Sequence, residues 1–166
     1  DGDGDGDGDG YADTLCNGKL PTVYVNGSNI IVGGPLDGQP YAGILLGGNG
    51  ADVIVGTDGE DAIDGGSGDD EICGGQGSDT LNTGGGNGKD LIVGGDGPDV
   101  LTGGNAKDTL CGNGGDDIIN GDNGKDDIDG GDGYDTIDGG NGKDNCANGE
   151  DETSCDTSVD LIEACN

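Results

Sequence analysis

Aspartates recur at a fixed interval in the glycine-rich middle of this chain. Between Gly47 and Ala147 the sequence consists of eleven copies of a nine-residue unit, G-G-x-G-x-D-x-U-x, in which U is an aliphatic residue. The sixth position of each copy holds an acid: Asp52, Asp61, Asp70, Asp79, Asp90, Asp99, Asp108, Asp117, Asp126, Asp135 and Asp144. Calcium prefers carboxylate oxygens, and glycine-rich loops can add backbone carbonyl oxygens to its ligand set. The spacing therefore predicts a series of calcium sites.

Short strands must position these aspartates. Positions seven to nine of each unit predict a three-residue strand, and the first six positions must turn the chain, which glycine permits by reaching φ > 0. Strand side chains alternate between faces, so the eighth residue points inward. That position holds Ile54, Ile63, Ile72, Leu81, Ile92, Leu101, Leu110, Ile119, Ile128 and Ile137, and Cys146 in the last unit.

Two units make one 18-residue coil, and coils about 4.8 Å apart stack into a parallel β-roll roughly 26 Å long. The aspartates of odd-numbered units (Asp52, Asp70, Asp90, Asp108, Asp126, Asp144) then line one side, the odd edge. Those of even-numbered units (Asp61, Asp79, Asp99, Asp117, Asp135) line the other, the even edge. The only break in register is a two-residue insertion, which the motif places at Thr83-Gly84.

The composition by itself is typical of disorder, with a net charge of −31 and few hydrophobic residues. Regular spacing of the aliphatic residues argues against disorder. Carboxylates stacked one strand apart repel one another, and a divalent cation between them reverses the sign of that interaction. Counting neighbouring aspartates gives about nine calcium sites between coils, five on the odd edge and four on the even edge. Magnesium is less suitable, because it requires a tighter octahedron.

The repeat resembles the hemolysin-type calcium-binding nonapeptide of RTX proteins. The resemblance implies an all-β, right-handed parallel β-roll, or β-solenoid, with calcium between turns. It also implies secretion from a bacterium and calcium ligation by the eleven aspartates. Three units depart at the second glycine (Thr57, Asn113, Asp122), and Ala106 replaces the third glycine, where it requires either φ < 0 or backbone strain.

The sequence divides into four segments. Residues 1–10 form an acidic Asp-Gly tail, and residues 11–46 predict an N-terminal cap with degenerate repeats. Residues 47–147 form the roll, and residues 148–166 predict a C-terminal cap. No stretch is apolar enough to span a membrane, and no signal peptide is visible, so we interpret the chain as a mature or trimmed product.

Six cysteines indicate an oxidising, extracellular setting. Cys146 and Cys155 fall nine residues apart, both on the inward position if a degenerate twelfth unit begins at Asn148. We therefore predict a disulfide between them, across the roll.

Cys73 and Cys111 occupy outward positions two coils apart, too far for a direct bond. Their candidate partners are Cys16 and Cys165, or cysteines of another chain.

Lysines form a second regular series on the odd edge: Lys89, Lys107, Lys125 and Lys143, accompanied by Asn87, Asn105, Asn123 and Asn141. They indicate either local compensation of acidic charge or a docking strip for an acidic partner, such as the tail of another copy. Ice binding by this edge is a third alternative, but the edge lacks the regular ladder of threonines that an ice-binding surface would need.

We expect a secreted calcium-binding structural protein that self-assembles, through its tail or the ends of the roll, into a filament or surface layer. The alternative is a calcium-dependent folding or secretion module of a larger RTX adhesin, toxin or enzyme. Catalysis by this chain is not expected, because it lacks histidine and no nucleophile has an evident base. The negative charge opposes nucleic-acid binding.

Overall fold

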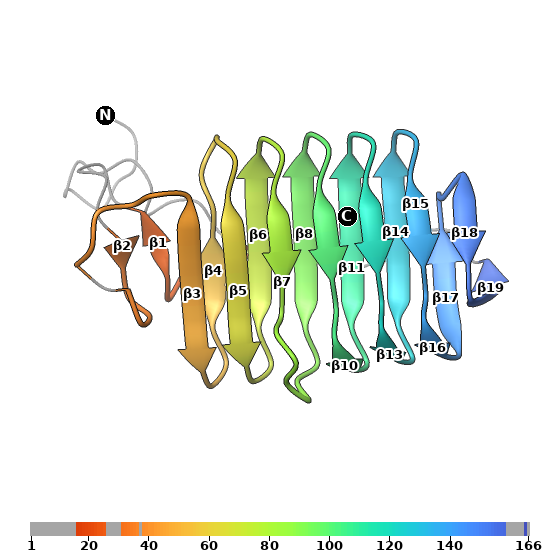
Figure 1. Cartoon of the computed structure of the whole chain (residues 1–166), viewed down its shortest axis with the longest axis horizontal. Coiled ribbons are helices and arrows are strands. Elements are labelled where there is room, and N and C mark those ends of the chain that lie inside the picture. The colour runs from red at the N-terminus through yellow and green to blue at the C-terminus, as the bar shows by residue number, and fades with distance from the viewer. Residues whose placement is uncertain (1–15, 26–30, 37, 159–164, 166) are drawn as a thin grey trace.

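The protein forms an elongated roll of stacked coils, seen from the side in Figure 1. The computed structural model describes residues 16–25, 31–36, 38–158 and 165. Two seven-stranded sheets form the walls of the roll, and their strands pair in parallel. This architecture is the parallel β-roll that the nonapeptide spacing predicts.

Strands of the two walls alternate along the chain. The first wall contains β3 (Ile44–Asn49), β5 (Ala62–Ser67), β7 (Thr80–Asn82), β9 (Val100–Thr102), β12 (Ile118–Asn120), β15 (Thr136–Asp138) and β18 (Asp151–Thr153). The second wall contains β4 (Val53–Val55), β6 (Glu71–Gln76), β8 (Leu91–Asp96), β11 (Thr109–Gly114), β14 (Asp127–Asp132), β17 (Asp144–Ala147) and β19 (Cys155–Ser158). A third, short sheet on the odd edge contains β10 (Asn105–Ala106), β13 (Asn123–Gly124) and β16 (Asn141–Gly142).

Several strands are longer than the predicted three residues. β3, β5, β6, β8, β11 and β14 each contain six, because the first three positions of the next unit continue the strand. Gly48 lies opposite Gly66, and Gly75 lies opposite Gly95. Glycine has a low propensity for β-strands, but hydrogen-bonded pairing between similar coils outweighs this low propensity here.

The core consists of two ladders of eighth-position side chains, each with at most 2% of its surface exposed. One wall supplies Leu45, Ile63, Leu81, Leu101, Ile119 and Ile137, and the other supplies Ile54, Ile72, Ile92, Leu110, Ile128 and Cys146. Each buried aliphatic side chain contributes about 1.5–3 kcal/mol. A core one residue deep on each wall is thin for this length of chain, so the two edges must contribute to stability.

The two-residue insertion lies at a different place from the one predicted. The motif made Thr83-Gly84 the insertion and Gly85 the first glycine of the next unit. In the structure Thr83 is buried at the first position, and its amide donates to the carbonyl of Thr102, just as the amide of Gly103 donates one coil further on. Gly85 is exposed within the longer loop that follows β7 (Figure 1). Hydrogen bonds between coils keep Thr83 in register, so the two extra residues lie in the glycine-rich loop that follows it.

The described part of residues 11–46 covers the first coil. β1 (Tyr24–Val25) and β2 (Ile31–Val32) form an antiparallel pair. Val23 bridges Ile54 in parallel and joins the buried core. The acidic tail of residues 1–10 lies outside the described residues, so its predicted docking remains a prediction.

The C-terminal segment extends both walls. β18 pairs with β15, and β19 pairs with β17. Cys155 therefore lies on the same wall as Cys146, on a neighbouring strand, and the prediction that the two face each other across the roll is wrong. The chain reverses direction at Ser154, which has φ +57°, directly after the three-residue β18. This early turn delivers Cys155 to the second wall.

Candidate metal sites

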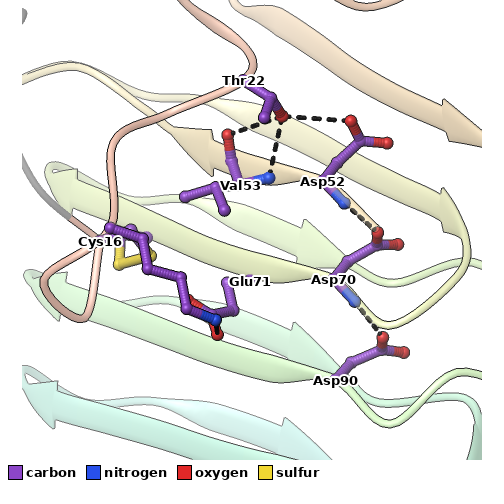
Figure 2. Close-up of polar contacts among 9 residues, drawn as sticks. Cys16, Thr22, Asp52, Val53, Asp70, Glu71 and Asp90 are labelled. Carbon is purple, nitrogen blue, oxygen red and sulfur yellow. Dashed lines mark hydrogen bonds and ion pairs between the residues drawn. A yellow bond between two sulfur atoms is a disulfide. The ribbon is translucent and has the colours of Figure 1, made fainter. Parts of the chain in front are cut away.

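Backbone hydrogen bonds fix the position-six aspartates in two ladders. In each coil after the first, one carboxylate oxygen accepts a bond of 2.8–2.9 Å from the amide of the equivalent aspartate one coil earlier. Figure 2 shows the start of the odd edge, where Asp52 donates to Asp70 and Asp70 donates to Asp90. The structure thus brings the predicted residues together, coil by coil, along both edges.

These carboxylates are buried. Ten of the eleven have at most 5% of their surface exposed, and Asp52 is partly buried. Burial, followed by the charges of neighbouring aspartates, raises the pKa of Asp79 and Asp108 to about 7. The same causes raise the pKa of Asp70 and Asp117 to about 6. Ionised carboxylates in this arrangement are unfavourable unless positive charge accompanies them.

The second carboxylate oxygen marks where that charge is needed. Ten of the eleven aspartates have a buried side-chain oxygen without a hydrogen-bond partner, and Asp90 is the exception. A buried acceptor without a partner costs about 1–3 kcal/mol, and more when it is charged. Such a row of unpartnered oxygens favours a bound cation at each coil.

The first glycine of a unit preserves space beside the Oδ2 atom of its aspartate. This atom is the unpartnered oxygen in the units with a first glycine except that of Asp61, where Oδ2 accepts from Thr57 and Oδ1 is unpartnered. A Cβ atom on Gly121 would lie 2.7 Å from Asp126 Oδ2 and 2.6 Å from the carbonyl oxygen of Gly139 in the next coil. We call this space, bounded by the carboxylate of the unit and the first-position carbonyl of the next coil, a cradle. The same pair of oxygens surrounds nine first glycines: Gly47, Gly56, Gly74, Gly94, Gly103, Gly112, Gly121, Gly130 and Gly139.

The donor set fits calcium. Among the described residues, no three acidic or cysteine side chains converge on one point. A cation in a cradle must therefore take part of its ligands from backbone carbonyls, which glycine turns expose. Calcium accepts six to eight oxygens in a flexible geometry, whereas magnesium requires a near-ideal octahedron.

Two residues at the ends of the ladders were not predicted from the sequence. Glu150 accepts the amide of Asp135 at 2.8 Å and so extends the even edge by one carboxylate. Thr22 bonds to Asp52 and to the backbone of Val53, and takes the place of a preceding coil (Figure 2). The spacing of 15 residues between Asp135 and Glu150, rather than 18, concealed the first, and Thr22 lies outside the repeat altogether.

All six cysteines are bonded within the chain. The disulfides are Cys16–Cys73, Cys111–Cys165 and Cys146–Cys155, with Cα–Cα distances of 5.7, 5.5 and 5.9 Å. Of the candidate partners for Cys73 and Cys111, those in the terminal segments are therefore correct. No cysteine is left over to support assembly with another chain.

Asparagines form a continuous ladder on the odd edge. Asn123 donates to Asn105, and Asn141 donates to Asn123, both at 3.1 Å. Asn105 donates instead to the carbonyl oxygens of Gly85 and Gly86, so the predicted fourth member, Asn87, does not take part. The displaced insertion explains the difference, because it moves Asn87 out of register.

Lys107 on the same edge pairs with Asp127 of the next coil. Burial pushes the pKa of Asp127 upward, but hydrogen bonds from Lys107 and Asn145, with the charges of Lys107 and Lys125, outweigh it and lower the pKa. These contacts support local compensation of acidic charge at Lys107, and the docking strip for an acidic partner stays a prediction.

Ala106 has φ +94°, so the strained alternative for this residue is the one that the structure contains. Asn113 and Asp122 also have positive φ, of +74° and +65°. Asparagine and aspartate tolerate this region better than alanine does. These positions therefore keep the turn without glycine, at a cost of about 1–3 kcal/mol for Ala106.

The comparisons with known proteins agree with this geometry. A family model described as RTX calcium-binding nonapeptide repeat (4 copies) matches residues 46–81, 84–119 and 120–152. No curated protein and no solved structure matches the chain. The described residues contain no helix that is long and apolar enough to cross a membrane.

Proposed function

The chain belongs to the RTX calcium-binding nonapeptide repeat family and binds calcium, and on this basis we propose that it is a secreted structural protein whose roll folds only with calcium. The unpartnered buried oxygens of ten aspartates carry this proposal. Their desolvation and mutual repulsion oppose folding of the ionised chain, and bound ions offset both. The proposed ligands are these carboxylates together with the facing carbonyl oxygens, and the nine cradles give about nine sites.

An extracellular location is the second part of the proposal. Three disulfides tie the roll to segments near both termini. Disulfides persist in oxidising compartments and are rare in the cytosol. Millimolar extracellular calcium would also saturate sites of modest affinity, which suits many weak sites better than one tight site.

The third part is end-to-end self-association into a filament or surface layer. β18 and β19 are the last strands of their walls, and each has one strand edge without a partner among the described residues. Such edges add strands from another molecule. Repetition of a contact that does not close on itself produces a fibre.

The test combines far-ultraviolet circular dichroism with light scattering on the oxidised chain. At pH 7.4, chelator should abolish the β signal and calcium should restore it. A full β signal in chelator would refute calcium-dependent folding. Light scattering in calcium should show polymers, and a monomer at all protein concentrations would instead favour a folding module of a larger RTX protein.

A further inference from the structure

One coil on the odd edge has no glycine at its first position. The first position of that coil is Thr83 rather than glycine, and only 1% of its surface is exposed. Its side chain therefore lies inside the edge. The equivalent space beside Gly103, one coil further on, is bounded by Asp108 Oδ2 at 3.0 Å and the carbonyl oxygen of Gly121 at 3.2 Å from a Cβ position.

The Thr83 hydroxyl contacts the two groups that correspond to these oxygens. It donates to the carbonyl oxygen of Gly103, the first-position carbonyl of the next coil. It also lies beside the carboxylate of Asp90, the position-six aspartate of its own coil. The side chain thus stands between the two oxygens that would face a cation in the other coils.

Asp90, in the same coil as Thr83, also differs from the other position-six aspartates. It is the one position-six aspartate without a buried, unpartnered side-chain oxygen. This property of Asp90 concerns its carboxylate oxygens, whereas the burial of Thr83 concerns the volume of the cradle. Steric occupation by Thr83 and the exceptional carboxylate of Asp90 therefore coincide at the same coil.

We infer that Thr83 takes the place of a calcium ion at this coil. The odd edge then binds ions in its cradles, beside Asp52 before this coil and beside Asp108, Asp126 and Asp144 after it. The neutral hydroxyl donates its hydrogen bond to the facing carbonyl oxygen of Gly103, and the side chain excludes the cation by volume. This inference rests on the proposed function, because it assumes that the remaining cradles hold calcium.

Counting bound calcium tests the inference. The oxidised full chain is equilibrated with calcium at pH 7.4, and bound ions per chain are measured by equilibrium dialysis and atomic emission. Thr83→Gly recreates the first glycine and should bind one more ion than the wild type. Thr83→Val fills the same volume without a hydroxyl and should bind the wild-type number. Thr80→Gly, an exposed threonine of the same coil, controls for the substitution itself and should also bind the wild-type number.

The outcomes separate this inference from the proposed function. Calcium binding by the wild type without a gain in Thr83→Gly would overturn the inference and leave the function intact. Loss of an ion in Thr83→Val would show that the hydroxyl is a ligand, and would also overturn it. A wild-type chain that binds no calcium would contradict the proposed function and the inference together. Circular dichroism of each variant in calcium verifies that the counted chains are folded.

Discussion

Two alanine substitutions, Gly121→Ala and Gly85→Ala, should have opposite effects on stability. The motif treats both glycines as first residues of their units, but the structure places only Gly121 there. Its Cβ would lie 2.6 Å from the carbonyl oxygen of Gly139 and 2.7 Å from Asp126 Oδ2, whereas a Cβ on Gly85 has no atom within 4 Å. Neither glycine has a left-handed φ, so sterics decide the outcome.

The expected magnitudes follow from these distances. Overpacking at Gly121 should lower the free energy of unfolding by about 1–3 kcal/mol, and filling the cradle should remove one calcium ion. At Gly85, alanine restricts the unfolded chain and should raise that free energy by about 0.4–1 kcal/mol. Guanidinium denaturation in saturating calcium, followed by circular dichroism, measures both. Equal effects of the two variants, or a larger loss for Gly85→Ala, would refute the assignment of the first positions.

Three further predictions concern the pH dependence of folding, the substitution of Asp117 and the removal of disulfides. Burial raises the folded-state pKa of five position-six aspartates from the ordinary 3.8 to between about 6 and about 7: Asp70, Asp79, Asp108, Asp117 and Asp126. Their stabilising contribution is therefore complete below the unfolded pKa and is lost as the pH rises through 6 to 7. In chelator, acidification from pH 8 to 5 should increase the β signal, and an unchanged signal would contradict the burial of these groups. Asp117→Asn should remove one ion and destabilise the calcium-bound chain at pH 7.4. It should leave the chelated chain at pH 5 equally or more stable. Denaturation in the two conditions measures both effects, and equal losses of stability in both would contradict a role as ligand. Replacing Cys16 and Cys73 by serine should lower the free energy of unfolding by about 4 kcal/mol, and replacing Cys146 and Cys155 should lower it by about 2.5 kcal/mol. The difference is expected because the two disulfides close loops of 57 and 9 residues. A larger loss for the Cys146–Cys155 pair in denaturation would contradict the entropic explanation.

Periodicity made most of the roll predictable. An identical unit repeated in register leaves one solution in which all aliphatic residues point inward and all position-six aspartates line the edges. The same periodicity failed at the insertion, because the motif alone cannot distinguish Thr83 from Gly85 at the first position. Inter-coil pairing decides that choice, and pairing is a property of neighbouring strands rather than of the local sequence.

The ends of the roll were less predictable for the same reason. Glu150 joins the even edge through a turn of irregular length, and Cys155 reaches the wall of Cys146 through a reversal at Ser154. A repeat count predicted the partner of Cys146 but not the wall on which that partner lies. Departures from a repeat must be placed by tertiary contacts.

Anomalous X-ray diffraction from crystals grown in calcium would locate the ions directly. We predict two files of calcium, one along each edge, with each ion beside the Oδ2 atom of a position-six aspartate and the first glycine of its unit. The odd-edge file should have a gap at Thr83. Calcium found only on the exposed surface, with the buried carboxylates free of metal, would contradict the role assigned to these aspartates.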